Sequence, residues 1–339
     1  MTLLSVRDLR VTFQRKGGRP TRAVDGVSFD VEAGSTLGLV GESGCGKSVT
    51  SLAILGLLPG RGTRVTGSVR FEGRELLGLP ERDIEGIRGR RIAMIFQDPM
   101  TSLNPVLTVG RQIGEVLERH FGTDRRSARR EVVDLLDAVG IPAADRRFDD
   151  YPHQLSGGMR QRVMIAMALA CKPELLIADE PTTALDVTIQ AQILDLLTGI
   201  TAERGTALLL ITHDLGVVAG TCETVSVMYS GRLVESAGRR ELFAAPLHPY
   251  TNGLLASVPR LDVPRGQPLH PIEGSPRDVI PWSAGCAFAP RCPNRIDRCT
   301  AATPNLDERM ANHLLRCFNP AGDAPPSSAE AGTEKVEAG

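Results

Sequence analysis

The stretch that decides the fold spans residues 41–48 and reads Gly41-Glu42-Ser43-Gly44-Cys45-Gly46-Lys47-Ser48. The apolar stretch 37–40 precedes it, and residues 48–58 are predicted to form a helix. A strand, a glycine turn and a helix N-terminus in this order are typical of a phosphate-binding loop. Glycines let backbone N–H groups surround phosphate oxygens, and the helix end adds partial positive charge. We therefore predict that Lys47 reaches the β- and γ-phosphates of a nucleotide and that the Ser48 hydroxyl faces magnesium.

The composition is that of an ordinary globular protein of 339 residues with a formal net charge of −1. Such a charge provides no global positive field that would attract nucleic acid. No apolar run approaches the roughly 20 residues that span a bilayer, and the N-terminal residues carry charges too early for a secretory signal. We expect a location on the cytoplasmic side of the cell membrane, with membrane contact made through partner subunits.

The order of apolar patterns predicts an α/β fold. Residues 1–35 alternate apolar and polar side chains, which is the period of half-buried strands. Between 111 and 140 the period becomes helical, and from 175 onward strands and helices alternate, which indicates a parallel sheet with crossover helices. We predict a lobe over 1–245 with an antiparallel β subdomain and a helical subdomain at about 100–165.

After residue 245 the sequence changes character. Prolines recur with little periodicity, and we predict a proline-rich strap and a cysteine-containing C-terminal region over 246–320. Residues 321–339 are rich in Ala, Gly, Glu, Pro and Ser and almost free of large apolar side chains, so we expect a disordered tail.

Two carboxylates, Asp179 and Glu180, end the apolar strand predicted at 175–178. Asp179 at the edge of a parallel sheet would lie beside the phosphate loop and hold magnesium through water, and Glu180 would polarise the attacking water as a general base. The alternative is a buried strand that happens to end in two solvated acids. The presence of Lys47 in its loop favours the functional interpretation.

A second glycine turn, Leu155-Ser156-Gly157-Gly158-Met159, opens another predicted helix and is a second candidate phosphate site. One nucleotide does not need two such sites from one chain. Two chains arranged head to tail would use both, with Ser156 of each chain covering the γ-phosphate held by the other.

In their order along residues 1–245, these motifs resemble those of the ATP-binding subunit of an ABC transporter. The resemblance implies a P-loop NTPase fold with ATPase activity. It also implies that Gln97 reports the nucleotide state to membrane subunits, that Asp186, in Ala184-Leu185-Asp186, crosses the dimer interface, and that His213 contacts the γ-phosphate. Phe13 is the aromatic residue expected to stack on adenine.

The candidate site residues fall into four sets. The predicted catalytic residues are Lys47, Glu180 and His213. The predicted nucleotide-binding residues are Phe13, Gly41, Glu42, Ser43, Gly44, Cys45, Gly46, Lys47, Ser48, Val49, Gln97 and Asp179. The residues expected to complete the site of a second chain are Leu155, Ser156, Gly157, Gly158 and Met159, together with Asp186. The predicted Mg²⁺ ligands are Ser48, Gln97 and Asp179.

Three stretches narrow the subfamily. Residues 96–105, 248–251 and 285–293 are similar to the corresponding stretches in the ATPases of dipeptide, oligopeptide and nickel importers. These importers have two paralogous ATPases, and Met159 in the second glycine turn resembles the first of the two at this position. This implies peptide import with a sister ATPase, two membrane-spanning permease subunits and an extracytoplasmic solute-binding protein, and no nucleic acid. Nickel or another small solute is the alternative cargo. A soluble ABC ATPase acting on DNA or ribosomes is the other alternative, but the interval from Gln97 to Ser156 is too short for the coiled-coil arm of such proteins.

Four of the seven cysteines lie in one C-terminal stretch, at Cys286, Cys292, Cys299 and Cys317. Paired Cys-x-x-Cys motifs, the usual zinc spacing, are absent from this set. The irregular gaps, together with the resemblance, favour a [4Fe-4S] cluster over Zn²⁺. Unliganded cysteines that fill a small core are the remaining alternative, and a structural or a redox-sensing role is left open.

Overall fold

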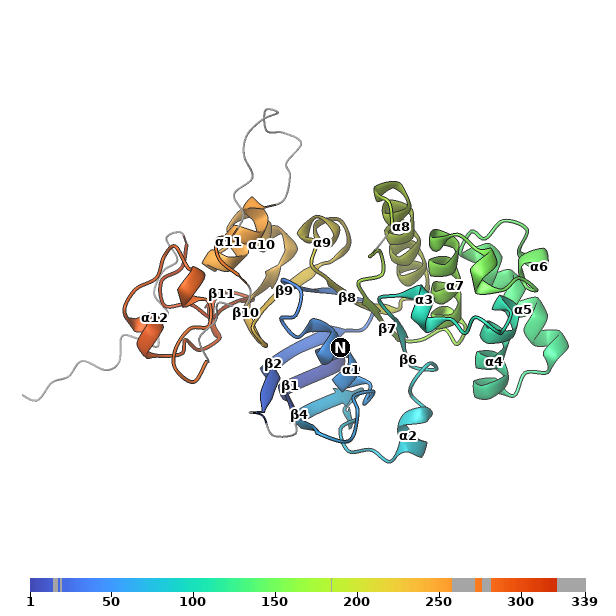
Figure 1. Cartoon of the computed structure of the whole chain (residues 1–339), viewed down its shortest axis with the longest axis horizontal. Coiled ribbons are helices and arrows are strands. Elements are labelled where there is room, and N and C mark those ends of the chain that lie inside the picture. The colour runs from blue at the N-terminus through green and yellow to red at the C-terminus, as the bar shows by residue number, and fades with distance from the viewer. Residues whose placement is uncertain (15–17, 19, 184, 258–271, 276–281, 322–339) are drawn as a thin grey trace, which may run out of the picture.

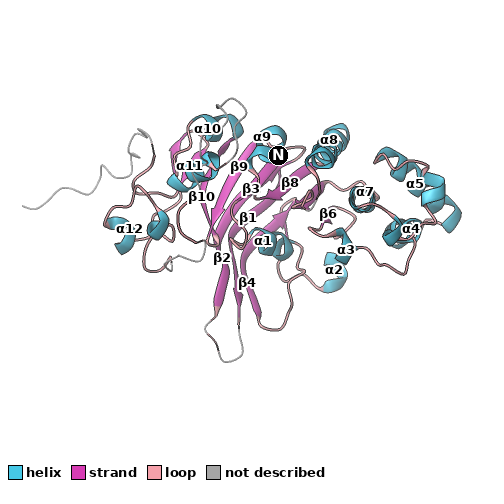
Figure 2. Cartoon of the chain, turned by 45° about the horizontal axis from the view of Figure 1, so that its top comes forward, coloured by secondary structure: helices cyan, strands magenta, loops and turns pink. Residues whose placement is uncertain are grey.

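The computed structural model describes residues 1–14, 18, 20–183, 185–257, 272–275 and 282–321. Figure 1 shows two sheets at the centre of the molecule, with a group of helices at one end and the C-terminal region at the other. Both sheets and their crossover helices are seen again, from another direction, in Figure 2. The predicted α/β fold is confirmed.

The main sheet has eight strands in the order β11-β12-β10-β9-β3-β8-β7-β6. From β9 to β6 all neighbouring strands are parallel, and β10, β12 and β11 add antiparallel pairs at the other edge. The central strands β7 and β8 are buried along their whole length, because one face of the sheet packs against helices that include α8 and α9, and the other packs against α1 and the second sheet. The strands are β3 (Thr36–Val40), β6 (Ile92–Ile95), β7 (Leu175–Asp179), β8 (Ala207–Thr212), β9 (Thr224–Tyr229), β10 (Arg232–Gly238), β11 (Asp307–Met310) and β12 (His313–Leu315).

The second sheet is antiparallel and has the strand order β2-β1-β4-β5. Its strands are β1 (Thr2–Phe13), β2 (Thr21–Glu32), β4 (Thr63–Phe71) and β5 (Arg74–Glu75). The buried side chains of β1, which include Leu4, Val6 and Leu9, face a core shared with β3 and α1. The antiparallel subdomain predicted for the front of the chain is therefore present.

The helical subdomain forms where the helical period was found. Thr108 caps α4 by accepting a hydrogen bond from the Arg111 amide, and Gly122 ends this helix with a left-handed backbone at φ 68°. Val109, Ile113 and Leu117 form the buried stripe of α4. The helices are α1 (Lys47–Ile54), α2 (Glu81–Glu85), α3 (Pro99–Ser102), α4 (Val109–Phe121), α5 (Arg125–Ala138), α6 (Ala144–Arg147), η1 (Pro152–Gln154), α7 (Gly157–Leu169), α8 (Val187–Arg204), α9 (Leu215–Thr221), α10 (Arg239–Ala244), α11 (Pro249–Ala256), η2 (Ala289–Arg291) and α12 (Arg298–Ala301).

The cysteine-containing C-terminal region joins the main sheet. It contributes β11 and β12 to the main sheet, where Leu315 and Leu314 of β12 pair with Glu235 and Ser236 of β10. Residues 258–271 and 276–281 of the predicted strap, and all but the first residue of the tail predicted at 321–339, lie outside the described residues. Within the part of the chain that is described, every helix is too short or too polar to cross a membrane.

Candidate nucleotide site

The phosphate loop connects β3 to α1, as the sequence predicts. At Gly41 an added Cβ would lie 2.2 Å from the carbonyl oxygen of Met228, so the end of β9 approaches the loop too closely for any side chain. Gly46 has a φ of 109° and directly precedes Lys47, the first residue of α1. The two positions explain why the loop needs glycine on both sides of its turn.

Lys47 is buried and its ammonium group lies inside the loop. Its Nζ donates hydrogen bonds to the carbonyl oxygens of Gly41, at 2.6 Å, and Glu42, at 3.1 Å. The amine is therefore held where a bound phosphate would be expected to meet it.

Ser48, the residue after Lys47, and Asp179 form a second part of the nucleotide site. The Ser48 hydroxyl donates to Oδ1 of Asp179 at 3.0 Å. Burial raises the pKa of Asp179, the hydrogen bond from Ser48 opposes this, and the neighbouring Glu180 charge adds to it. A hydroxyl next to a buried carboxylate is the oxygen donor set that Mg²⁺ prefers, so these residues fit the ion of an Mg-nucleotide.

Glu180 is the meeting point of three side chains from different elements. Its Oε2 accepts hydrogen bonds from Gln97 Nε2 and Thr183 Oγ1, both at 2.9 Å. Nδ1 of His213 lies 3.3 Å from the other oxygen, Oε1. Gln97, predicted to bind nucleotide and Mg²⁺, and His213, predicted to be catalytic, thus both lie at the carboxylate of Glu180.

Thr183 was missed as a site residue. Its position three residues after Glu180 is the only signal in the sequence, and it becomes meaningful only once the turn that follows β7 is known. Phe13, in contrast, is the last residue of β1 and packs, half-buried, against the core of the antiparallel sheet. Its stacking on adenine stays a prediction.

The second glycine turn lies apart from this site. Ser156 caps α7 by accepting from the Met159 amide at 3.4 Å, and Leu155 anchors the turn in the core. Among the described residues, none of 155–159 makes a hydrogen bond to the phosphate loop, and both views place α7 with the helical subdomain rather than with α1. Within the described part of the chain, the exposed Ser156 and Gly157 are therefore not part of the site at the phosphate loop.

Asp186 opens α8 in the same way. Its side chain accepts from the Ile189 amide at 3.0 Å, and it is exposed beside Val187, whose side chain is 83% exposed. Ala184 of the same predicted loop lies outside the described residues. At Asp186 the loop is exposed, and its contact with a second chain stays a prediction.

The cysteines of the C-terminal region lie near one another as free thiols. Cys286, Cys299 and Cys317 are buried and Cys292 is half-buried, all four as free thiols. Burial raises the pKa of Cys286 to about 11 and that of Cys317 to about 12, with neighbouring cysteines adding to both shifts. Across the residues described, no three His, Cys, Asp or Glu side chains are arranged to hold a metal ion. The predicted [4Fe-4S] or Zn²⁺ centre is therefore not confirmed.

Comparison with known proteins agrees with this geometry. The family described as "ABC transporter" matches residues 24–183, and the family described as "Oligopeptide/dipeptide transporter, C-terminal region" matches residues 234–299. The dipeptide transport ATP-binding protein DppD of Bacillus subtilis is 53% identical over 93% of this chain and 94% of its own length. The oligopeptide transport ATP-binding protein OppD of Escherichia coli is 53% identical over 94% of this chain and 93% of its own length.

Among solved structures, the ATP-binding cassette MJ0796, in a dimer bound to ADP and Pi, covers 70% of this chain with a TM-score of 0.63 and 26% identity. The alignment includes 99% of that cassette. The fold and the phosphate loop thus define an ATPase of the ABC class. More narrowly, the chain belongs to the ATP-binding proteins of the oligopeptide and dipeptide ABC transporters.

Proposed function

We propose that this chain hydrolyses ATP to drive the import of dipeptides or oligopeptides across the cytoplasmic membrane. The observation that carries the proposal is the convergence of Gln97, Thr183 and His213 on Glu180, next to the Ser48–Asp179 pair. The named substrates of DppD and OppD support peptides over nickel or another small solute as the cargo.

The residues of the site divide the chemical work. Lys47 binds the β- and γ-phosphates, and Ser48, Asp179 and Gln97 hold Mg²⁺, which supplies charge neutralisation on the phosphate oxygens. Glu180 accepts a hydrogen bond from the attacking water, orients it toward the γ-phosphate and takes up its proton as a general base. His213 lies on the other carboxylate oxygen of Glu180, where it contacts the γ-phosphate once ATP is bound.

A complete site requires a second ATPase chain. The exposed glycine turn at Ser156 and the exposed Asp186–Val187 start of α8 support a head-to-tail pair with a paralogous subunit. Phe96 and Met100, which flank Gln97, are 40% and 61% exposed and offer an apolar surface to permease subunits. Together with an extracytoplasmic solute-binding protein, these partners place the chain at the cytoplasmic face of the membrane. Copurification with nucleic acid instead of permeases would favour a soluble ABC ATPase.

Substituting Glu180 tests the catalytic proposal. In the assembled transporter, Glu180→Gln is expected to retain ATP binding and to reduce ATP hydrolysis about 1,000-fold, because an amide orients water but accepts no proton. The measurements are phosphate release and nucleotide affinity on the same preparation. The matched control is Glu203→Gln, an identical change at an exposed position of α8. Hydrolysis at the wild-type rate in Glu180→Gln would remove Glu180 from this role.

We further propose that Cys286, Cys292, Cys299 and Cys317 bind a metal centre, with a [4Fe-4S] cluster favoured over Zn²⁺. The proposal is supported by the electrostatic interaction of Cys317 with the other three thiols, which indicates that all four lie near one another. The four thiols must move closer together when they bind the metal centre. Protein prepared without oxygen is expected to contain iron and sulfide and to absorb visible light. A colourless, iron-free and fully folded protein would contradict the [4Fe-4S] cluster.

A further inference from the structure

A buried arginine of the C-terminal region contacts the phosphate loop. Arg291, directly before Cys292, has a side chain that is only 2% exposed. Its guanidinium makes two parallel hydrogen bonds to the carboxylate of Glu42, from Nη1 to Oε2 at 2.7 Å and from Nη2 to Oε1 at 3.0 Å. Glu42 is the second residue of the phosphate loop. The contact therefore joins residues that lie 249 positions apart in the sequence.

Tyr250 of α11 holds the backbone of the same residue. The Glu42 amide donates a hydrogen bond to the Tyr250 hydroxyl at 2.9 Å, and the Tyr250 ring is fully buried. This ring packs edge-on against Tyr229 and Phe288, with centroid distances of 4.7 and 5.3 Å. Both the side chain and the main chain of Glu42 are thus held from the C-terminal side.

A third contact reaches the opposite side of the loop. Trp282 Nε1 donates to the carbonyl oxygen of Ser230 at 2.8 Å, and the next residue, Gly231, donates its amide to the carbonyl oxygen of Cys45, also at 2.8 Å. The turn between β9 and β10 is therefore fixed between Trp282 and the phosphate loop.

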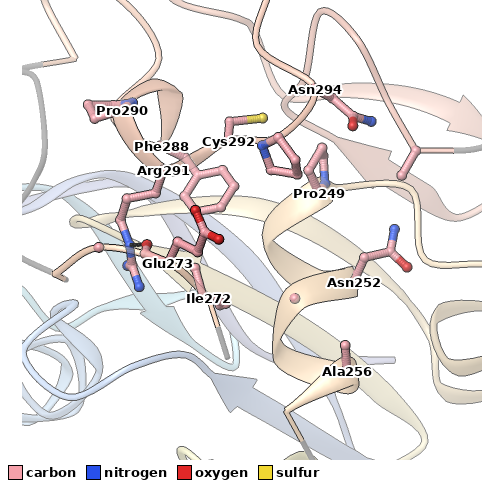
Figure 3. Close-up of a pocket in the computed structure, with 14 residues that line it drawn as sticks. Pro249, Asn252, Ala256, Ile272, Glu273, Phe288, Pro290, Arg291, Cys292 and Asn294 are labelled. Atoms are coloured by element: carbon pink, nitrogen blue, oxygen red, sulfur yellow. Dashed lines mark hydrogen bonds between the residues drawn. The ribbon is translucent and has the colours of Figure 1, made fainter. Parts of the chain in front are cut away.

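The far side of the Arg291 segment is less tightly packed. Arg291, Phe288 and Cys292 line a cavity of about 760 Å³ between α11 and the C-terminal segment (Figure 3). On this side Arg291 Nε donates to the carbonyl oxygen of Glu273 at 3.0 Å. The ionic contact of the guanidinium is with the phosphate loop.

The charge of Glu42 requires such a partner. A carboxylate in a loop that binds phosphate repels the anion, and Lys47 in the same loop is directed to backbone carbonyls rather than to Glu42's carboxylate. A guanidinium that binds the carboxylate in a bidentate manner both neutralises its charge and fixes its orientation. We propose that Arg291 is a positioning residue for ATP binding, through which the cysteine-containing C-terminal region holds the phosphate loop and cancels the charge of Glu42. The inference rests on the proposed nucleotide site.

A double-mutant cycle on the full chain in the assembled transporter tests the inference. Arg291→Met is expected to weaken Mg-ATP binding at least about tenfold, because it leaves the Glu42 carboxylate of the phosphate loop without a counter-charge. In a Glu42→Gln background the same substitution is expected to cost less than about threefold, since there is no charge left to neutralise. Arg295→Met, which removes an exposed charge four residues away, is the matched control.

The outcomes separate the inference from the proposed function. If the wild type does not bind Mg-ATP, the proposed function fails. If the wild type binds and Arg291→Met binds equally well, or if the loss persists in the Glu42→Gln background, only the role of Arg291 is overturned. Should Arg291→Met not fold, Tyr250→Phe removes the other contact to Glu42 and is expected to weaken Mg-ATP binding several-fold, with unchanged binding again overturning the inference.

Discussion

At the scale of single residues, Glu180 shows how the fold prepares its carboxylate. Its backbone adopts a left-handed conformation, with φ 46°, that residues other than glycine rarely adopt. The Glu180 amide donates to the carbonyl oxygen of Ile211 at 2.8 Å, so the neighbouring strand β8 holds the residue in this conformation. Strain of this kind is retained where function requires it, which agrees with the role proposed for Glu180.

His248 allows a prediction about pH and stability. The side chain is 1% exposed, and burial lowers its pKa from 6.5 to about 4, while Glu235 opposes the shift. Between these values the unfolded chain binds more protons than the folded chain, so stability should fall as pH drops from about 6.5 to about 4. The full effect is about 3 kcal/mol. Melting temperatures measured from pH 7 to pH 5 should therefore decrease.

The control for this prediction is a substitution of His248 that still accepts the hydrogen bond made by the imidazole but has no titratable side chain. His248 Nδ1 accepts from the Tyr250 amide at the start of α11, and asparagine can accept the same bond. The melting temperature of His248→Asn should depend less on pH than that of the wild type. In the control His153→Asn, at an exposed position, the pH dependence of the melting temperature should equal that of the wild type. Glu235, whose pKa is lowered despite burial because His313 donates to it, loses its contribution only below about pH 4.5. An identical slope in His248→Asn would refute the assignment.

At the scale of elements, the sequence predicts those with a strong period and misses those without one. The apolar spacing in α4 and α5, and the continuous apolar runs of β7 and β8, identify these elements with small errors at their ends. The strand β11, in contrast, has the sequence Asp-Glu-Arg-Met and is mostly exposed. It is a strand because β12 pairs with it, and local propensity carries no sign of that partner.

At the scale of the whole molecule, the two glycine turns lie apart from each other. The phosphate loop lies at the centre of the molecule, and α7 begins in the helical subdomain. In the proposed head-to-tail pair, one chain would offer one half of each of two sites, and closure of the pair on ATP would unite the halves.

A substitution in the second turn tests this arrangement. Ser156→Arg should leave the affinity of the isolated chain for ATP within about twofold, because its own phosphate loop is untouched. In the assembled transporter the same change should reduce ATP hydrolysis at least about 100-fold, since a bulky cation would obstruct the site completed by this turn. Lys47→Ala is the reference variant that loses binding in the isolated chain. Loss of ATP binding by isolated Ser156→Arg would place the turn in its own chain's site.

By itself the sequence determined the phosphate loop, the carboxylate pair, the second glycine turn and the class of fold. These features are local, because each depends on a few residues at fixed spacing next to a strand or a helix. Only the tertiary structure decided that Thr183 joins Gln97 and His213 at Glu180, and that Arg291 meets Glu42. Such contacts depend on the order of strands in the sheet and on the docking of the C-terminal region, which bring together residues that no local pattern relates.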